Sequence, residues 1–129
     1  MRRSIPIATP AATPSGPLRV RRGRVAYLRC DQASGRACPR DEGMEQAVWA
    51  AIEGLAACPS GPRTGGEADV RLDYRGDEAP TVEWRDTFAD EVQRLDRDTV
   101  LGCLRAVLGA TRRTIDAERL LVSFRFSME

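Results

Sequence analysis

Apolar and polar residues alternate along several parts of this chain, which is the pattern of a β-strand with one buried face. The alternation is cleanest at 120–128, where every second residue is large and apolar. The positions between them hold Leu121, Ser123, Arg125 and Ser127. A second alternating run covers 68–75, and after a Gly-Asp turn a third covers 82–88 and includes Trp84. We therefore expect a terminal strand and a β-hairpin.

Two other segments carry apolar residues at helical spacing. The first begins after Asp41, a suitable N-cap, and its stripe runs from Met44 to Leu55 before Pro59 ends it. The second begins near Asp96 or Asp98. Its stripe consists of Val100, Leu104, Val107 and Leu108. Each segment predicts an amphipathic helix with one buried face.

A short strand at 25–28 precedes the first helix, because this stretch is β-branched and aromatic. The order of elements predicts an α+β fold, with two helices packed on one face of a small, mainly antiparallel sheet of three to four strands. We expect the terminal strand to lie at or near an edge of this sheet. The alternative places it in the interior, between 25–28 and the hairpin.

The 129 residues suffice for one domain and not for two. Residues 1–17 are rich in Pro, Ala and Thr, which predicts a disordered tail or linker, and residues 18–129 form the single domain. Neither a signal-peptide pattern nor an apolar run long enough for a membrane helix is visible. We expect the Arg cluster between Arg19 and Arg29 to be mainly a solvated linker end.

The composition argues against catalysis. The sequence has no His, which removes imidazole bases, Ser-His-Asp triads and most zinc and iron sites. It also lacks a phosphate loop and a Cys-x-x-Cys redox motif. The net charge of +1 does not suit a surface built for nucleic acid. We therefore expect no enzyme activity, no cofactor, no metal and no small-molecule substrate.

The four cysteines occupy loop positions and helix positions. Cys30 and Cys38 flank a Gly-containing loop, while Cys58 ends the first helix and Cys103 lies on the second. We favour the disulfides Cys30–Cys38 and Cys58–Cys103 over the two crossed pairings, over four reduced thiols, and over a zinc site using all four. Disulfides indicate a periplasmic or envelope location. Since no export signal is visible, we expect the chain to be the terminal part of a longer protein, or its start to be misassigned.

Several short motifs are similar to those of one bacterial family. They are Leu55-Ala56-Ala57-Cys58, the strand at 68–72, the turn Gly76-Asp77, the segment from Leu95-Asp96 through 100–105 with Cys103, and the aromatic strand 122–126. Over about two thirds of its length the chain thus resembles the TonB C-terminal-like domains, most closely the cysteine-containing AgmX-type branch of gliding-motility and envelope proteins. The resemblance implies an α+β domain of the cell envelope without catalysis.

The most favoured function is therefore a non-catalytic interaction domain of the envelope, the C-terminal module of a larger protein. Its terminal strand would bind a protein partner by edge-strand addition, or a second copy, through Leu121, Ser123, Arg125 and Ser127. Trp49 lies one position off the helix stripe, which suggests either partner binding or plain packing. One alternative is a regulatory or stabilising tail of a membrane-anchored signalling protein, with the membrane reached only through an upstream segment. Another is a cytosolic nucleic-acid binder acting through its arginines.

Overall fold

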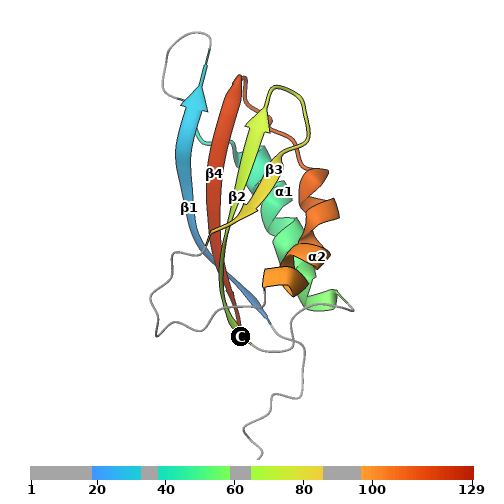
Figure 1. Cartoon of the computed structure of the whole chain (residues 1–129). Coiled ribbons are helices and arrows are strands. Elements are labelled where there is room, and N and C mark those ends of the chain that lie inside the picture. Colours follow the sequence, from blue (N-terminus) through green and yellow to red (C-terminus); the bar gives the residue numbers. More distant parts are fainter. Residues whose placement is uncertain (1–18, 33–37, 59–64, 86–96) are drawn as a thin grey trace, which may run out of the picture.

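A computed structural model describes residues 19–32, 38–58, 65–85 and 97–129. Over these residues the elements are β1 (Val20–Asp31), α1 (Glu42–Glu53), the 3-10 turn η2 (Gly54–Ala57), β2 (Gly66–Arg75), β3 (Thr81–Trp84), α2 (Arg97–Gly109) and β4 (Arg119–Met128). Both helices lie on one face of a single antiparallel sheet (Figure 1). This confirms the predicted α+β fold class. The predicted tail at 1–17, and Phe88, lie outside the described residues.

The strand order is β1-β4-β2-β3, so the terminal strand lies next to an edge of the sheet and not at it, in the interior position that we gave as the alternative. β4 is hydrogen-bonded to β1 on one side and to β2 on the other (Figure 1). The interior position follows from its composition, since five of its side chains are large, apolar and buried. A central strand loses more apolar surface to its neighbours than an edge strand does. The two edges of the sheet are therefore β1 and β3.

The hydrophobic core lies between the helices and the inner face of the sheet. Every second residue of β2 and of β4 points into it, as the alternation predicts. The helix stripes contribute Met44, Val48, Ile52 and Leu104, all at most 1% exposed. Val107 was predicted to belong to the buried stripe, but its side chain is 50% exposed, so that prediction is wrong. Leu101 is instead among the buried residues of α2, beside Val100, Leu104 and Leu108.

Asp41 confirms its predicted role as the N-cap of α1 and also joins this helix to the chain before β4. Its carboxylate accepts the backbone N–H of Met44 at 3.0 Å. It accepts the backbone N–H groups of Thr114 at 2.6 Å and Ile115 at 3.1 Å, and the hydroxyl of Thr114. Burial would raise the pKa of Asp41, but these four hydrogen bonds outweigh it and hold the pKa below its usual value.

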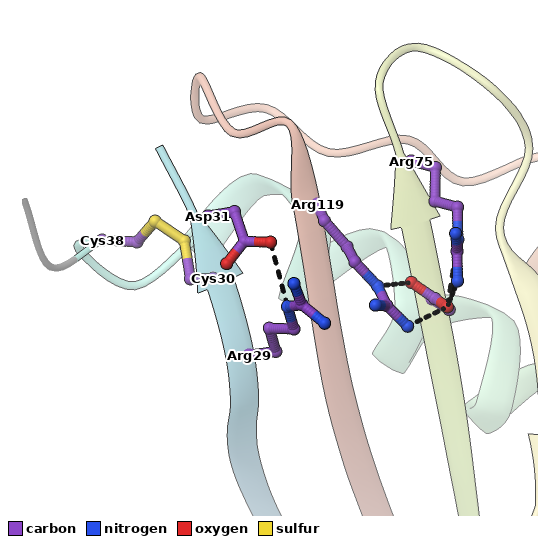
Figure 2. Close-up of polar contacts among 7 residues, drawn as sticks. Arg29, Cys30, Asp31, Cys38, Arg75 and Arg119 are labelled. Carbon is purple, nitrogen blue, oxygen red and sulfur yellow. Dashed lines mark hydrogen bonds and ion pairs between the residues drawn. A yellow bond between two sulfur atoms is a disulfide. The ribbon is translucent and has the colours of Figure 1, made fainter. Parts of the chain in front are cut away.

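The cysteine pairing is the one that the sequence favours. Cys30 of β1 is bonded to Cys38, with Cα atoms 6.1 Å apart, and Cys58 after η2 is bonded to Cys103 of α2, with Cα atoms 6.3 Å apart. Figure 2 shows the first bridge at the end of β1. Two such bridges are compatible with an oxidising location outside the cytosol.

β1 is longer than the predicted strand at 25–28, because it includes most of the Arg cluster that we assigned to a linker end. Its register against β4 shifts twice, between Arg22 and Val25 and between Tyr27 and Arg29. Each shift places one extra residue on β1, which defines a β-bulge. The bulges break the period-2 pattern and so hide the strand in the sequence.

Gly23, at the first bulge, is required by a close backbone approach. A Cβ atom at this position would lie 2.4 Å from the carbonyl oxygen of Arg125 on β4.

We expect Gly23→Ala to lower the free energy of unfolding by about 1–3 kcal/mol through overpacking. The control is Gly102→Ala on the exposed side of α2, where a Cβ meets nothing within 4 Å. That change should raise stability by about 0.5–1 kcal/mol. Urea denaturation compares the two, and equal effects would contradict the role of Gly23.

Candidate functional site

The terminal strand does not offer the edge that we expected for partner binding. Leu121, Ser123, Arg125 and Ser127 lie on the face of β4 away from the helices, which we call the outer face of the sheet. Their backbone groups belong to a strand that is paired on both sides. Any contact that these four residues make with a partner must therefore use side chains on a sheet surface.

Trp49 is also placed differently from the interpretation as a binding residue. It is 5% exposed, and its ring packs edge-on against Phe124 with ring centroids 5.3 Å apart. The guanidinium of Arg22 covers it at 5.5 Å from the ring centroid. The buried face of α1 includes Trp49 because the sheet on which α1 packs extends past β4 to β1. Trp49 is thus a core residue beneath an edge strand.

One end of the outer face is closed by ion pairs. Arg119 and Arg75 both contact the carboxylate of Asp73, at 3.0 Å and 3.2 Å. Figure 2 shows the two arginines converging from neighbouring strands, with Arg29 and Asp31 paired beside them. The hydrogen bonds from Arg119 outweigh partial burial and lower the pKa of Asp73. Each of the three arginines at this end is therefore already paired with a carboxylate.

The free edge of β1 is the feature that the sequence did not reveal. Arg19 and Glu129 exchange both backbone hydrogen bonds, at 2.7 and 2.9 Å, and so form a hydrogen-bonded pair of an antiparallel ladder. Because such pairs alternate along a ladder, the N–H and C=O of Val20 and Arg22 point away from β4. Val25 has the same orientation, since its partner Phe124 belongs to the set that faces β2.

No strand among the described residues pairs with these outward groups. We call residues 20–25 the free edge. The other half of β1 is partly covered, since Cys30 is tied to Cys38 and the backbone N–H of Asp41 donates to the hydroxyl of Tyr27 at 2.7 Å. The unpaired backbone therefore concentrates in the N-terminal half of the strand.

A hollow of about 390 Å³ lies beside the free edge, between β1 and α1. Its lining combines an apolar floor with charged walls. The residues are Arg22, Gly23, Val25, Tyr27, Arg40, Glu45 and Trp49. On this side of the sheet, the side chains of Val20 and Val25 are only partly buried against the core. The hollow thus leaves room for side chains from a segment lying next to β1.

The charged walls of this hollow are held in place by hydrogen bonds. Glu45 accepts from Arg40 at 2.5 and 3.1 Å and from the hydroxyl of Tyr27. The hydrogen bonds from Arg40 hold the pKa of Glu45 below its usual value. Burial and the contact with Glu45 raise the pKa of Tyr27 well above 10, so its hydroxyl stays protonated and donates. This network holds Arg40, Glu45 and Tyr27 in place along the wall.

A second hollow of about 210 Å³ lies on the outer face, one strand inward from the free edge. It is lined by three arginines, one acid and an apolar floor. The residues are Arg24, Ala26, Leu28, Asp69, Arg71, Ser123 and Arg125. Asp69 accepts from Ser123 at 2.6 Å and lies 3.7 Å from Arg125. The hollow therefore holds more positive than negative charge.

The described residues contain no group of three or more Cys, Asp or Glu side chains arranged to hold a metal ion. Within the same ranges, no helix has the length and apolar character needed to cross a membrane. Comparisons of the chain with protein-family models, with curated proteins and with solved structures find no match.

Proposed function

We propose that this chain is a non-catalytic protein-interaction domain of the cell envelope, which binds an extended segment of a partner by strand addition at the free edge. The observation that carries the proposal is the outward backbone of Val20, Arg22 and Val25, which has no strand partner among the described residues. A partner strand would satisfy these donors and acceptors and complete the sheet. The strand addition expected from the sequence thus moves from β4 to β1.

Two further features support this proposal. The hollow between β1 and α1 lies where an added strand would place every second side chain, so it provides a pocket for specificity. The disulfides are compatible with an oxidising compartment, and the resemblance to TonB C-terminal-like domains favours the envelope among such compartments. Strand addition at the free edge needs no catalytic group.

Proline substitutions test strand addition, because the direction of each backbone N–H differs along β1. Arg22→Pro removes an N–H that points away from β4, so the domain should stay folded, while Arg22→Ala removes only the side chain. The probe is a set of extended peptides selected from a displayed random library on the oxidised domain. We expect Arg22→Pro to bind these peptides about 10-fold more weakly than Arg22→Ala, which corresponds to one lost hydrogen bond.

Arg21→Pro is the matched control for folding. Arg21 lies opposite Ser127 in the hydrogen-bonded set, so its proline removes a bond to β4 and should destabilise the domain by circular dichroism. A folded Arg22→Pro variant that binds the selected peptides as tightly as Arg22→Ala would contradict strand addition. Failure to select any peptide that binds at β1 would favour the alternative, a stabilising or regulatory tail without a partner of its own.

A further inference from the structure

The free edge carries an unusual density of positive charge. Four of the six residues at 19–24 are arginines. Arg22 is held by Glu53 at 2.8 and 3.0 Å, and Arg21 contacts Glu129 at 3.0 Å. No other described residue forms a hydrogen bond or ion pair with the side chain of Arg24, which lines the hollow of the outer face.

The other charged residues of that hollow lie farther from the free edge. Arg125 of β4 lies 3.7 Å from Asp69, whose carboxylate also accepts from Ser123. Arg71 of β2 lies opposite Glu83 of β3, and its Nε atom is buried without a hydrogen-bond partner. Arg24 is thus the arginine of this hollow that belongs to β1, and its charge lies on the outer face within one Debye length, about 8–10 Å, of a segment next to β1.

The geometry of an added strand determines which of its residues would meet this charge. Successive side chains of a strand point to opposite faces of the sheet. Next to the free edge, one set would lie on the outer face beside Arg21 and Arg24. The other set would lie on the helix side, beside Val20 and Val25 and over the hollow of Trp49.

From this pattern, and resting on the strand addition proposed above, we propose that the partner is an acidic segment of another protein. Its carboxylates occupy alternate positions and face the outer side of the sheet, and small or apolar side chains occupy the positions between them. Opposite charges at neighbouring cross-strand positions stabilise pairing, whereas like charges destabilise it. Charge complementarity therefore selects both the composition and the register of the partner.

The same charge disfavours a second copy of this chain as the occupant. Pairing of β1 with β1 about a two-fold axis places the segment 19–24 against itself, so two arginine clusters meet. In the register that places Arg21 of one copy opposite Arg24 of the other, the like charges destabilise the pair. The homodimer expected as an alternative partner would therefore form less readily at the free edge than a complex with an acidic segment.

Three synthetic peptides test the proposal against the full oxidised domain. In the first, Glu alternates with Val; in the second, Gln replaces Glu; in the third, Lys replaces Glu. We expect the Glu peptide to bind at least ~10-fold more tightly than the Lys peptide at low salt, with the difference shrinking at high salt. Arg24→Glu should weaken binding of the Glu peptide by ~5–10-fold. The control Arg105→Glu, an equal charge change on the exposed side of α2, should leave it within about twofold.

The outcomes separate this proposal from strand addition itself. If the Gln peptide binds as tightly as the Glu peptide, and both lose affinity with Arg22→Pro, then strand addition holds and the acidic partner is wrong. If Arg22→Pro changes the binding affinity of none of the three peptides, both proposals are wrong. If sedimentation finds a dimer of the wild-type domain that Arg22→Pro abolishes, the occupant of the free edge is a second copy.

Discussion

Removing the disulfide between Cys58 and Cys103 is expected to destabilise the domain more than removing the disulfide between Cys30 and Cys38. The pair spans 45 residues, so chain entropy assigns it about 4 kcal/mol, against about 2.5 kcal/mol for the 8-residue span of Cys30 and Cys38. A domain of this size has about 5–15 kcal/mol of stability in total. Loss of the Cys58–Cys103 disulfide therefore removes a large share of the domain's free energy of unfolding.

Urea denaturation of two oxidised double variants measures this difference. One carries Cys58→Ala with Cys103→Ala, and the other carries Cys30→Ala with Cys38→Ala. Full reduction of the wild-type protein should cost about the sum of the two, since the bridges lie at opposite ends of the fold and do not share residues. Equal losses in the two variants would contradict the entropic origin of the stabilisation.

Asp41→Ala is expected to have the second large effect, a loss of about 2–4 kcal/mol. The change removes the cap of α1, worth about 1 kcal/mol, and leaves the backbone N–H groups of Thr114 and Ile115 without their acceptor. Asp41→Asn keeps one oxygen acceptor and should lose about half as much. Thermal or urea unfolding of the three proteins at neutral pH compares these values.

The pH dependence of the free energy of unfolding provides a second test of the role of Asp41. Because the pKa of Asp41 is lower in the folded protein than in the unfolded chain, its contribution is complete above the unfolded value of about 4. It is lost as the pH falls through the lower folded value. The stability difference between wild type and Asp41→Ala should therefore shrink below about pH 4. A difference that stays constant through this range would contradict the role of the ionised carboxylate.

The elements that the sequence predicts well are those specified by neighbouring residues. Asp41 caps α1 through the N–H of Met44, three positions away. The strands β2 and β4 are visible because apolar residues occupy every second position at 68–74 and 120–128, and only Leu121 departs from the polar set between them. The cysteine pairing follows from the same local elements, since Cys103 packs against the core from α2 and Cys58 comes directly after η2, where the first helical segment ends. Local patterning thus suffices for the fold class and the cross-links.

The candidate site required information that no local pattern carries. Strand order depends on which strands compete for β4, and the sequence left its interior position only as an alternative. The free edge was hidden because the inward residues Val20, Arg22, Val25, Tyr27 and Cys30 are spaced two, three, two and three apart by the bulges. For a related reason the sequence left Trp49 open between partner binding and packing, since its burial depends on β1 lying beside β4.

The central position of β4 also determines when the sheet can form. β1 and β2 do not pair with each other, and both are joined only through β4, the last of the four described strands along the chain. A growing chain therefore lacks the strand that joins β1 to the β2–β3 hairpin until residues 119–128 become available. Pairing over such sequence separations raises the contact order and slows folding. The complete sheet would thus form only after β4, the last described strand along the chain, is available.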